Sequence, residues 1–171
     1  MRKFAAILVG AALAGAVATA AGAFSIGPHA ARCDAGESSV IVNVTGFRAR
    51  TGTVRVQIYH ANQRTMFERR QWLVRVDVPV TRSGDMPICV PVSAPGRYAV
   101  SVRHDLNGNG NSDRADGGGF SGNPDVSLLD MMFRRKPAVE RVAFSVGQGA
   151  ARQTVILNYI QGSSFDPLPR N

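Results

Sequence analysis

The stretch with the clearest capacity for chemistry runs from Asp105 to Asp116 and reads Asp-Leu-Asn-Gly-Asn-Gly-Asn-Ser-Asp-Arg-Ala-Asp. Aligned with the twelve-residue calcium loop, it places side-chain oxygens at positions 1, 3, 5, 9 and 12 and glycine at position 6, where the chain must turn sharply. Calcium takes six to eight oxygens, and the carbonyl of Asn111 at position 7 adds one more. The spacing predicts a calcium loop whose ligands are Asp105, Asn107, Asn109, Asn111, Asp113 and Asp116.

The composition of this loop predicts weak binding. Two ligand positions carry neutral asparagine, and the last carries the short Asp116 where a bidentate glutamate is usual. We therefore expect a dissociation constant of roughly 10⁻⁴ to 10⁻³ M, the range of extracellular modules. The alternative is that Asn107-Gly108 and Asn109-Gly110 are turn dipeptides and the aspartates cap backbone amides.

Two histidines end predicted strands, His60 and His104. If these strands are neighbours, the two side chains could hold a transition metal and support a hydrolase. His104-Asp105 followed by Ser121 also suggests a nucleophile, but no Gly-x-Ser-x-Gly elbow accompanies the serine. The alternation of the strand favours a structural His104, and we predict no catalytic residue.

A glycine-rich segment, residues 117–124, follows the calcium-type loop. It precedes no helix and lacks the lysine of a phosphate-binding loop, so it is typical of a tightly turned connection. We predict that the edge formed by residues 105–124 contacts a ligand, and the candidate side chains there are His104, Phe120, Ser121 and Asn123.

The chain is basic, with 20 Lys and Arg against 12 Asp and Glu, a net charge of +8. Such a surface attracts nucleic acid, anionic lipid or polysaccharide, and export excludes nucleic acid as a partner. Arg55, Arg75 and Arg103 alternate with apolar residues, which indicates a solvated sheet face. The cluster Arg134-Arg135-Lys136 supports an alternative function, the binding of anionic glycan or lipid.

The first residues have the pattern of a targeting segment. Met1 to Lys3 is basic, Phe4 to Val17 is apolar, and Ala21-Gly22-Ala23 supplies the small residues before a cut. We predict cleavage before Phe24, with a second possible site at residues 18–20; the alternative is an uncleaved anchor. Cleavage removes two basic residues and lowers the net charge from +8 to +6.

The two cysteines, Cys33 and Cys89, both follow this segment. An even number of cysteines in an oxidising compartment predicts one disulfide, which would tie the N-terminal part of the mature chain to the sheet.

The elements that must position these groups are strands. Period-2 alternation recurs in about seven short segments separated by turn residues, and Ala61–Gln71 is the best candidate for a short helix. The pattern predicts an all-β, seven-stranded immunoglobulin- or transthyretin-like (prealbumin-like) sandwich with one long loop, from His104 to about Pro137. The segments carry Val40, Val42 and Val44; Val54, Val56 and Ile58; Trp72, Val74, Val76 and Val78; Ile88 to Val92; Tyr98, Val100 and Val102; Val142, Phe144 and Val146; Val155, Leu157 and Tyr159.

We divide the chain accordingly into a signal peptide at 1–23, a lead-in segment at 24–36, one sandwich domain at 37–161 and a flexible tail at 162–171.

The order of motifs also resembles a known family. The motifs are Pro95-Gly96-Arg-Tyr98, His104-Asp105-Leu-Asn-Gly-Asn-Gly, Asp116-Gly-Gly-Gly-Phe120-Ser-Gly-Asn-Pro124, Lys136-Pro137, Val142-Ala-Phe144 and Leu157-Asn-Tyr159. Over residues 33–161 the chain resembles the bacterial domain of unknown function 2141 family. Two departures are Gly122, where asparagine is common, and a longer segment from Val126 to Arg135.

The resemblance implies an exported protein of the Gram-negative envelope, periplasmic or secreted, with a sandwich similar to transthyretin-like and carboxypeptidase-regulatory-like domains. It implies no activity or ligand. We expect a monomeric, non-enzymatic binding or accessory module with a weak calcium loop, no membrane span in the mature chain, and a protein, glycan or envelope component as its partner.

Overall fold

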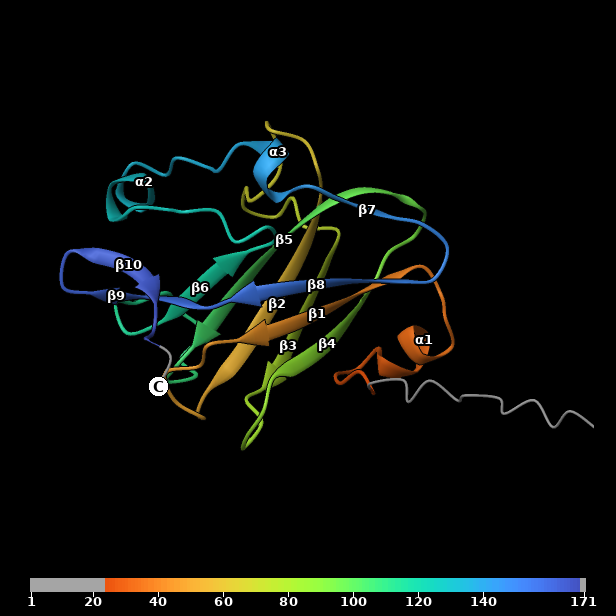
Figure 1. Ribbon diagram of the computed structural model, residues 1–171, viewed down its shortest axis with the longest axis horizontal. Coiled ribbons are helices and arrows are strands. Elements are labelled where there is room, and N and C mark those ends of the chain that lie inside the picture. Colours follow the sequence, from red (N-terminus) through yellow and green to blue (C-terminus); the bar gives the residue numbers. More distant parts are fainter. Residues whose placement is uncertain (1–23, 170–171) are drawn as a thin grey trace, which may run out of the picture.

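The computed structural model describes residues 24–169, which form two packed β-sheets (Figure 1). In the three-stranded sheet, β1 (Ser39–Thr45) lies between antiparallel β4 (Met86–Pro91) and parallel β8 (Ala150–Ile156). The seven-stranded sheet has the order β10 (Ser164–Pro167), β9 (Asn158–Gln161), β6 (Gly117–Phe120), β5 (Gly96–Asp105), β2 (Thr53–His60) and β3 (Val74–Pro79), and β7 (Phe144–Val146) also pairs with β5. The predicted signal peptide lies outside the described residues.

The core lies between the two sheets and is built from alternate residues of each strand. Successive side chains of a strand point to opposite faces, so one face of each sheet can be entirely apolar. The all-β sandwich expected from the sequence is therefore confirmed in its coarse form. The fully buried core residues include Val40, Val42 and Val44 of β1, Val54, Val56 and Ile58 of β2, Ile88 and Val90 of β4, Tyr98 and Val100 of β5, and Val155 of β8.

The number of strands differs from the expected seven, because the described residues contain ten. β6 lies inside the segment expected to be a long loop, and three of its four residues are glycine. Glycine has no side chain to alternate, so the pattern that marks other strands is missing. β10 lies in the segment expected to be a flexible tail.

The helix expected at Ala61–Gln71 is a series of turns instead. Met66 is fully buried, and together with Phe67 and Trp72 it packs on the outer face of the seven-stranded sheet. Two short helices, α2 (Leu128–Met132) and α3 (Val139–Val142), follow β6. In Figure 1, α3 lies above the label of β5 and α2 lies on the side of β6, β9 and β10. No helix within residues 24–169 is long and apolar enough to span a membrane.

The predicted disulfide between Cys33 and Cys89 is present. It joins α1 (Ala30–Asp34) to β4, and both cysteines pack with Ile41 of β1. The bond therefore fixes α1 on the outer face of the three-stranded sheet, which explains why Ile41 is buried although its neighbours Val40 and Val42 point into the core.

Groups that are not strands cover part of each edge of the three-stranded sheet. At β4, Ile26 donates its amide to the Pro87 carbonyl (2.8 Å) and accepts from the Cys89 amide (3.0 Å). At β8, the side-chain amide of Asn123 donates to the Thr154 carbonyl (3.0 Å) and accepts from the Ile156 amide (2.8 Å). β4 also contains Pro87 and Pro91, and a proline has no backbone N–H to donate to another strand.

Candidate functional site

The two histidines that end strands do not meet. In the β2–β5 pairing His60 stands opposite Tyr98 and His104 stands opposite Val54, so the histidines are six positions, about 20 Å, apart along the strands. Within residues 24–169 no three His, Cys, Asp or Glu side chains form a metal-binding group. The hydrolase alternative, which required the histidines to converge, therefore has no geometric support.

His104 is fully buried and its two ring nitrogens are both engaged. Nε2 lies 2.9 Å from the Thr51 carbonyl, which can only accept, so Nε2 carries the proton. Nδ1 then accepts from the Tyr159 hydroxyl at 2.7 Å, and that hydroxyl accepts from the Arg48 amide at 3.1 Å. This chain of hydrogen bonds joins β5 to β9 and gives His104 a structural role.

Burial raises the pKa of Tyr159 above its ordinary value, because the phenolate is poorly solvated inside the sandwich. The folded state therefore holds this proton more tightly than the unfolded state, and the associated stability is complete below pH about 10 and decreases as pH rises further. We expect the free energy of unfolding, measured in urea from pH 8 to 11, to fall less steeply in Tyr159→Phe than in the wild type. Parallel slopes in the two proteins would contradict this assignment.

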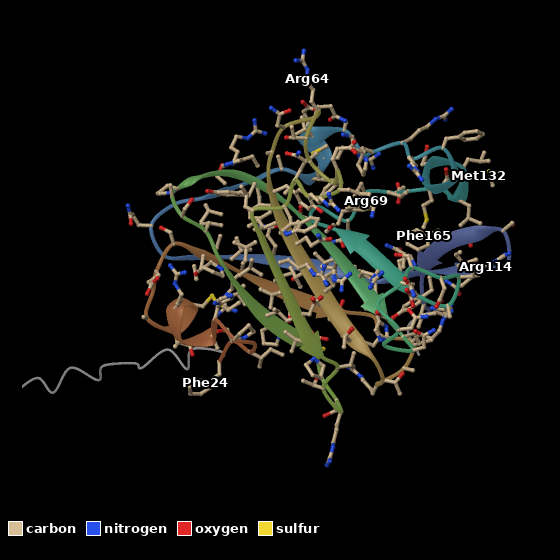
Figure 2. All side chains as sticks on the ribbon, turned by 180° about the vertical axis from the view of Figure 1, so that it is seen from behind. Phe24, Arg64, Arg69, Arg114, Met132 and Phe165 are labelled. Carbon is tan, nitrogen blue, oxygen red and sulfur yellow. A yellow bond between two sulfur atoms is a disulfide. The ribbon has the colours of Figure 1, made fainter. Side chains whose placement is uncertain are left out.

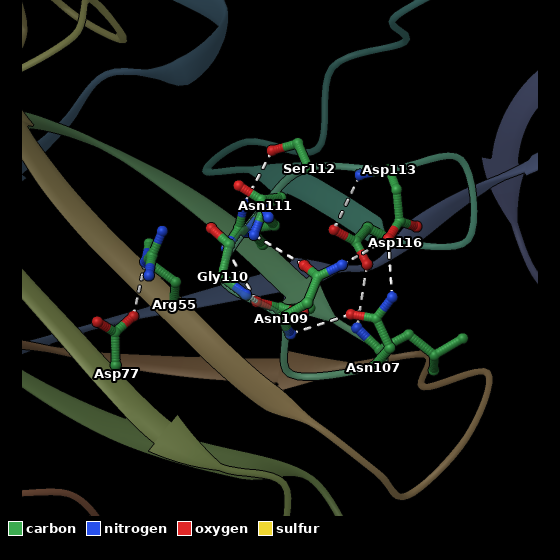
Figure 3. Close-up of polar contacts among 12 residues, drawn as sticks. Arg55, Asp77, Asn107, Asn109, Gly110, Asn111, Ser112, Asp113 and Asp116 are labelled. Atoms are coloured by element: carbon green, nitrogen blue, oxygen red, sulfur yellow. Dashed lines mark hydrogen bonds and ion pairs between the residues drawn. The ribbon is translucent and has the colours of Figure 1, made fainter.

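The predicted calcium ligands lie together in one compact loop (Figure 3). Asn107 Oδ1 accepts from the Asn109 amide (3.0 Å), Asn109 Oδ1 from the Asn111 amide (2.8 Å), and Asp113 Oδ1 from the Ala115 amide (2.9 Å). The bond from Ala115 is the main cause that lowers the pKa of Asp113. Each turn thus directs a side-chain oxygen toward the loop backbone, a geometry that suits both the turn interpretation and the calcium interpretation.

Two buried aspartates close the loop. Asp116 Oδ1 accepts from the Leu106 amide (3.1 Å) and its Oδ2 from the Asp113 amide (3.3 Å). Asp105 Oδ2 accepts from the Gly110 amide at 2.8 Å. The first and last predicted ligands therefore hold the two ends of the loop against each other.

The four residues predicted to form a ligand edge have different environments. His104 is buried, as described above, and Ser121 is also fully buried, where its hydroxyl accepts from the Val100 amide and donates to the Val142 carbonyl. The amide of Asn123 is used by the edge of β8. Phe120 is partly exposed and lines a cavity.

That cavity is a groove of about 590 Å³ on the outer face of the seven-stranded sheet. β2, β5 and β6 provide its floor, and the segment 126–137, which contains α2, provides its roof. The lining residues are Gln57, Tyr59, Phe67, Glu68, Arg69, Ser101, Val102, Gly118, Gly119, Phe120, Val126, Asp130, Met131, Arg134, Arg135, Lys136, Pro137 and Phe165.

Aromatic side chains form the apolar part of the groove. The Phe67 ring lies 5.3 Å from Tyr59 and 4.7 Å from Phe120, measured between centroids. Phe165 of β10 contributes a further aromatic ring to the lining. Burial raises the pKa of Tyr59, so its hydroxyl stays protonated well above neutral pH.

The basic cluster predicted at residues 134–136 lines this groove, and its members differ. Lys136 is held in place, since Nζ donates to Glu68 (2.9 Å) and to the Arg64 carbonyl (3.0 Å). Arg135 lies 4.0 Å from Asp130. Arg134 and Arg69 have no ion-pair partner within residues 24–169, so the lining carries two unpaired cations. Figure 2 shows the face that bears Arg69 and Phe165.

Sequence reasoning identified Phe120 and the basic cluster but missed the groove. The Tyr59–Phe67 pair, Phe120 and Phe165 come from three segments far apart in the chain, and they are brought together because β6 pairs between β5 and β9. Two features of the sequence could have indicated the groove, namely the glycine-rich run before Phe120 and the long segment after it.

The profile of a family described as an uncharacterized protein conserved in bacteria (DUF2141) matches residues 42–154. The chain belongs to this family. The match includes β2, β5, β6 and the calcium-type loop, and it ends before β9. The DUF2141 resemblance drawn from the motifs is confirmed in this respect. No curated protein and no solved structure matches the chain.

Proposed function

We propose that the protein is an exported, non-enzymatic binding module whose groove takes a small amphipathic anion. The observation that carries this proposal is the cavity of about 590 Å³ with aromatic side chains in its wall and two unpaired arginines in its lining. Cavities of this size suit small molecules, and a few polar groups in an apolar lining set the orientation of the ligand.

The lining determines the chemical class of ligand. Tyr59, Phe67 and Phe120 offer apolar faces to an alkyl chain or an aromatic ring. Arg69 and Arg134 offer guanidinium groups, which donate paired hydrogen bonds to a carboxylate, phosphate or sulfonate. A molecule with an apolar body and one anionic head satisfies both parts.

Backbone conformation supports a binding role for this face. Phe67 and Arg134 have positive φ, 63° and 51°, although neither is glycine. Such conformations cost about 1–3 kcal/mol each and concentrate at ligand-binding sites.

The non-enzymatic role is proposed because the acids in the groove are ion-paired, and export is proposed because of the disulfide. Glu68 and Asp130, the acids that line the groove, are paired with Lys136 and Arg135, which favours binding over acid–base chemistry. The disulfide Cys33–Cys89 is compatible with export, because such bonds persist in oxidising compartments.

The test is calorimetric titration of the chain from Phe24 onward with sodium dodecanoate, kept below the concentration at which it forms micelles. We expect saturable binding that weakens with added salt, because screening reduces the attraction between the head group and the arginines. The double variant Arg69→Gln/Arg134→Gln should bind at least about tenfold more weakly, since two charge-assisted contacts are lost.

The matched control is Arg82→Gln/Arg152→Gln, which removes the same charge from exposed positions outside the groove. It should retain wild-type affinity. Equal losses of affinity in the two double variants would show that binding depends only on the net charge of the protein, and this would contradict the proposal. Equal binding of dodecyltrimethylammonium, which has the same chain and the opposite charge, would also overturn the proposal.

A further inference from the structure

Asp105 carries a buried carboxylate oxygen without a partner. The side chain is 2% exposed, and its Oδ2 accepts from the Gly110 amide and from Arg103 (3.1 Å). Its Oδ1 is buried and makes no hydrogen bond, and the buried Nε of Arg103, its ion-pair partner, makes none either. An unpaired, buried acceptor costs free energy, and a charged one costs more, so such an atom needs a physical explanation.

This carboxylate is hydrogen-bonded to the backbone of the calcium-type loop. Gly110 lies on the far side of the turn from Asp105, and a 2.8 Å bond joins its amide to Oδ2, which directs the carboxylate across the loop interior. Figure 3 shows Asn107, Asp113 and Asp116 close together in the same loop, with Asn109 between them and Gly110.

The remaining loop oxygens have capacity for a cation. The side-chain oxygens of Asn107 and Asn109 each accept one bond from a backbone amide. An amide oxygen has two acceptor positions, so each keeps one. Asp113 Oδ2 accepts from the side-chain amides of Asn107 (2.9 Å) and Asn109 (3.4 Å), contacts that a cation can replace.

We propose that residues 105–116 bind calcium, with the orphaned Asp105 Oδ1 as the anchoring ligand. The other donors are the side-chain oxygens of Asn107 and Asn109 and the carbonyl of Asn111. Asp113 and Asp116 complete the set, and because the three carboxylates do not form a metal-binding group in this conformation, these two side chains must turn toward the cation when it binds. This set matches the hard oxygen ligands and the high coordination number that calcium takes. This loop site is separate from the groove, and the calcium proposal goes beyond the proposed function. A negative result for calcium would therefore leave the groove proposal intact, and a negative result for the groove would leave the calcium proposal intact.

Arg103 limits the affinity of this site. Its guanidinium donates to Asp105 Oδ2 (3.1 Å), to the Gly110 carbonyl (3.0 Å) and to Ser112 Oγ (2.9 Å). It therefore already neutralises one side of the Asp105 carboxylate, and the cation must take the Oδ1 side. Together with two neutral asparagine ligands, this places the dissociation constant at roughly 10⁻⁴ to 10⁻³ M.

The experiment measures thermal unfolding and heats of binding of the chain from Phe24 onward in calcium chloride, magnesium chloride and chelator. In 10 mM calcium the melting temperature should rise by about 3–6 °C, because a cation that binds only the folded state stabilises it by mass action. Magnesium should have little effect, since it loses its water reluctantly and prefers octahedral sites. No rise in calcium, or an equal rise in magnesium, would overturn the proposal.

Two variants and a control locate the site. Asp105→Asn should abolish the calcium response, whereas Asp125→Asn, at an exposed position outside the loop, should retain it. Asn109→Asp adds a carboxylate at an exposed position and should tighten binding about tenfold, a gain that a merely unfolded loop cannot produce. A response that persists in Asp105→Asn, or an Asn109→Asp variant with unchanged affinity, would refute the assignment.

Discussion

Gly122→Ala should destabilise the protein by about 4 kcal/mol or more, a loss at the extreme of what single substitutions cause. Gly122 has φ +74°, and a Cβ at this position would lie 2.0 Å from the backbone carbonyl oxygen of Arg141. The carbonyl belongs to α3, whose position is fixed by the buried Val142. The clash cannot be relieved by rotating a side chain, so the main chain must move.

Gly84→Ala is the matched control for this measurement. Gly84 has the same φ of +74°, but a Cβ there would have no atom within 4 Å. It should lose only the roughly 1–2 kcal/mol that a left-handed conformation costs a residue with a side chain. Unfolding in urea measures both losses, and equal values would contradict the steric explanation.

Removing the disulfide should have the second largest effect. The double variant Cys33→Ala/Cys89→Ala opens a loop with a sequence separation of 56, and the chain-entropy model for a loop of this size gives a loss of about 4 kcal/mol. We expect a lower urea midpoint than in the oxidised wild type, and the reduced wild type should shift by a similar amount.

The disulfide variants also separate stability from binding. α1 lies on the outer face of the three-stranded sheet, whereas the groove lies on the outer face of the seven-stranded sheet. At temperatures where the variant remains folded, its affinity for dodecanoate should equal that of the wild type. A large loss of affinity would show that the two outer faces are coupled through the core.

The sequence predicted those strands in which buried apolar side chains alternate with exposed ones. β2 could be recognised from Val54, Val56 and Ile58, which alternate with polar residues. The alternation arises because these three side chains are buried on the inner face of the sheet. β6 could not be found in this way, because Gly117 and Gly119 are required by close neighbours: a Cβ at these positions would lie 2.4 Å from the Tyr159 ring and 2.6 Å from the Ile156 carbonyl.

The two candidate sites differ in the same way: the residues of the loop are close together in the sequence, whereas those of the groove are brought together only by the fold. The loop at 105–116 is a local arrangement, so its spacing could be recognised within twelve residues of sequence. The groove depends on which strands are neighbours. Likewise, the helical pattern suggested for Ala61–Gln71 came from Met66 and Phe67, whose apolar side chains instead cover the sheet.

The two proposed sites lie on one face of the molecule. A smaller cavity of about 190 Å³ is lined by Ser112 and Asp116 from the calcium-type loop and by Gly118, Met131 and Phe165, which also line the groove. The loop and the groove are therefore neighbours, and the effect of the loop on the groove can be measured by comparing the dodecanoate affinity of Asp105→Asn with that of the wild type in chelator.

The covered edges of the three-stranded sheet bear on how the protein behaves in a crowded compartment. Amyloid growth and strand exchange both need an open row of backbone amides and carbonyls on which another chain can build. Ile26 occupies those groups at β4, and Asn123 occupies them at β8. These contacts shorten the stretch of open edge on which another chain could build, and this disfavours self-templated aggregation of the native protein through the three-stranded sheet.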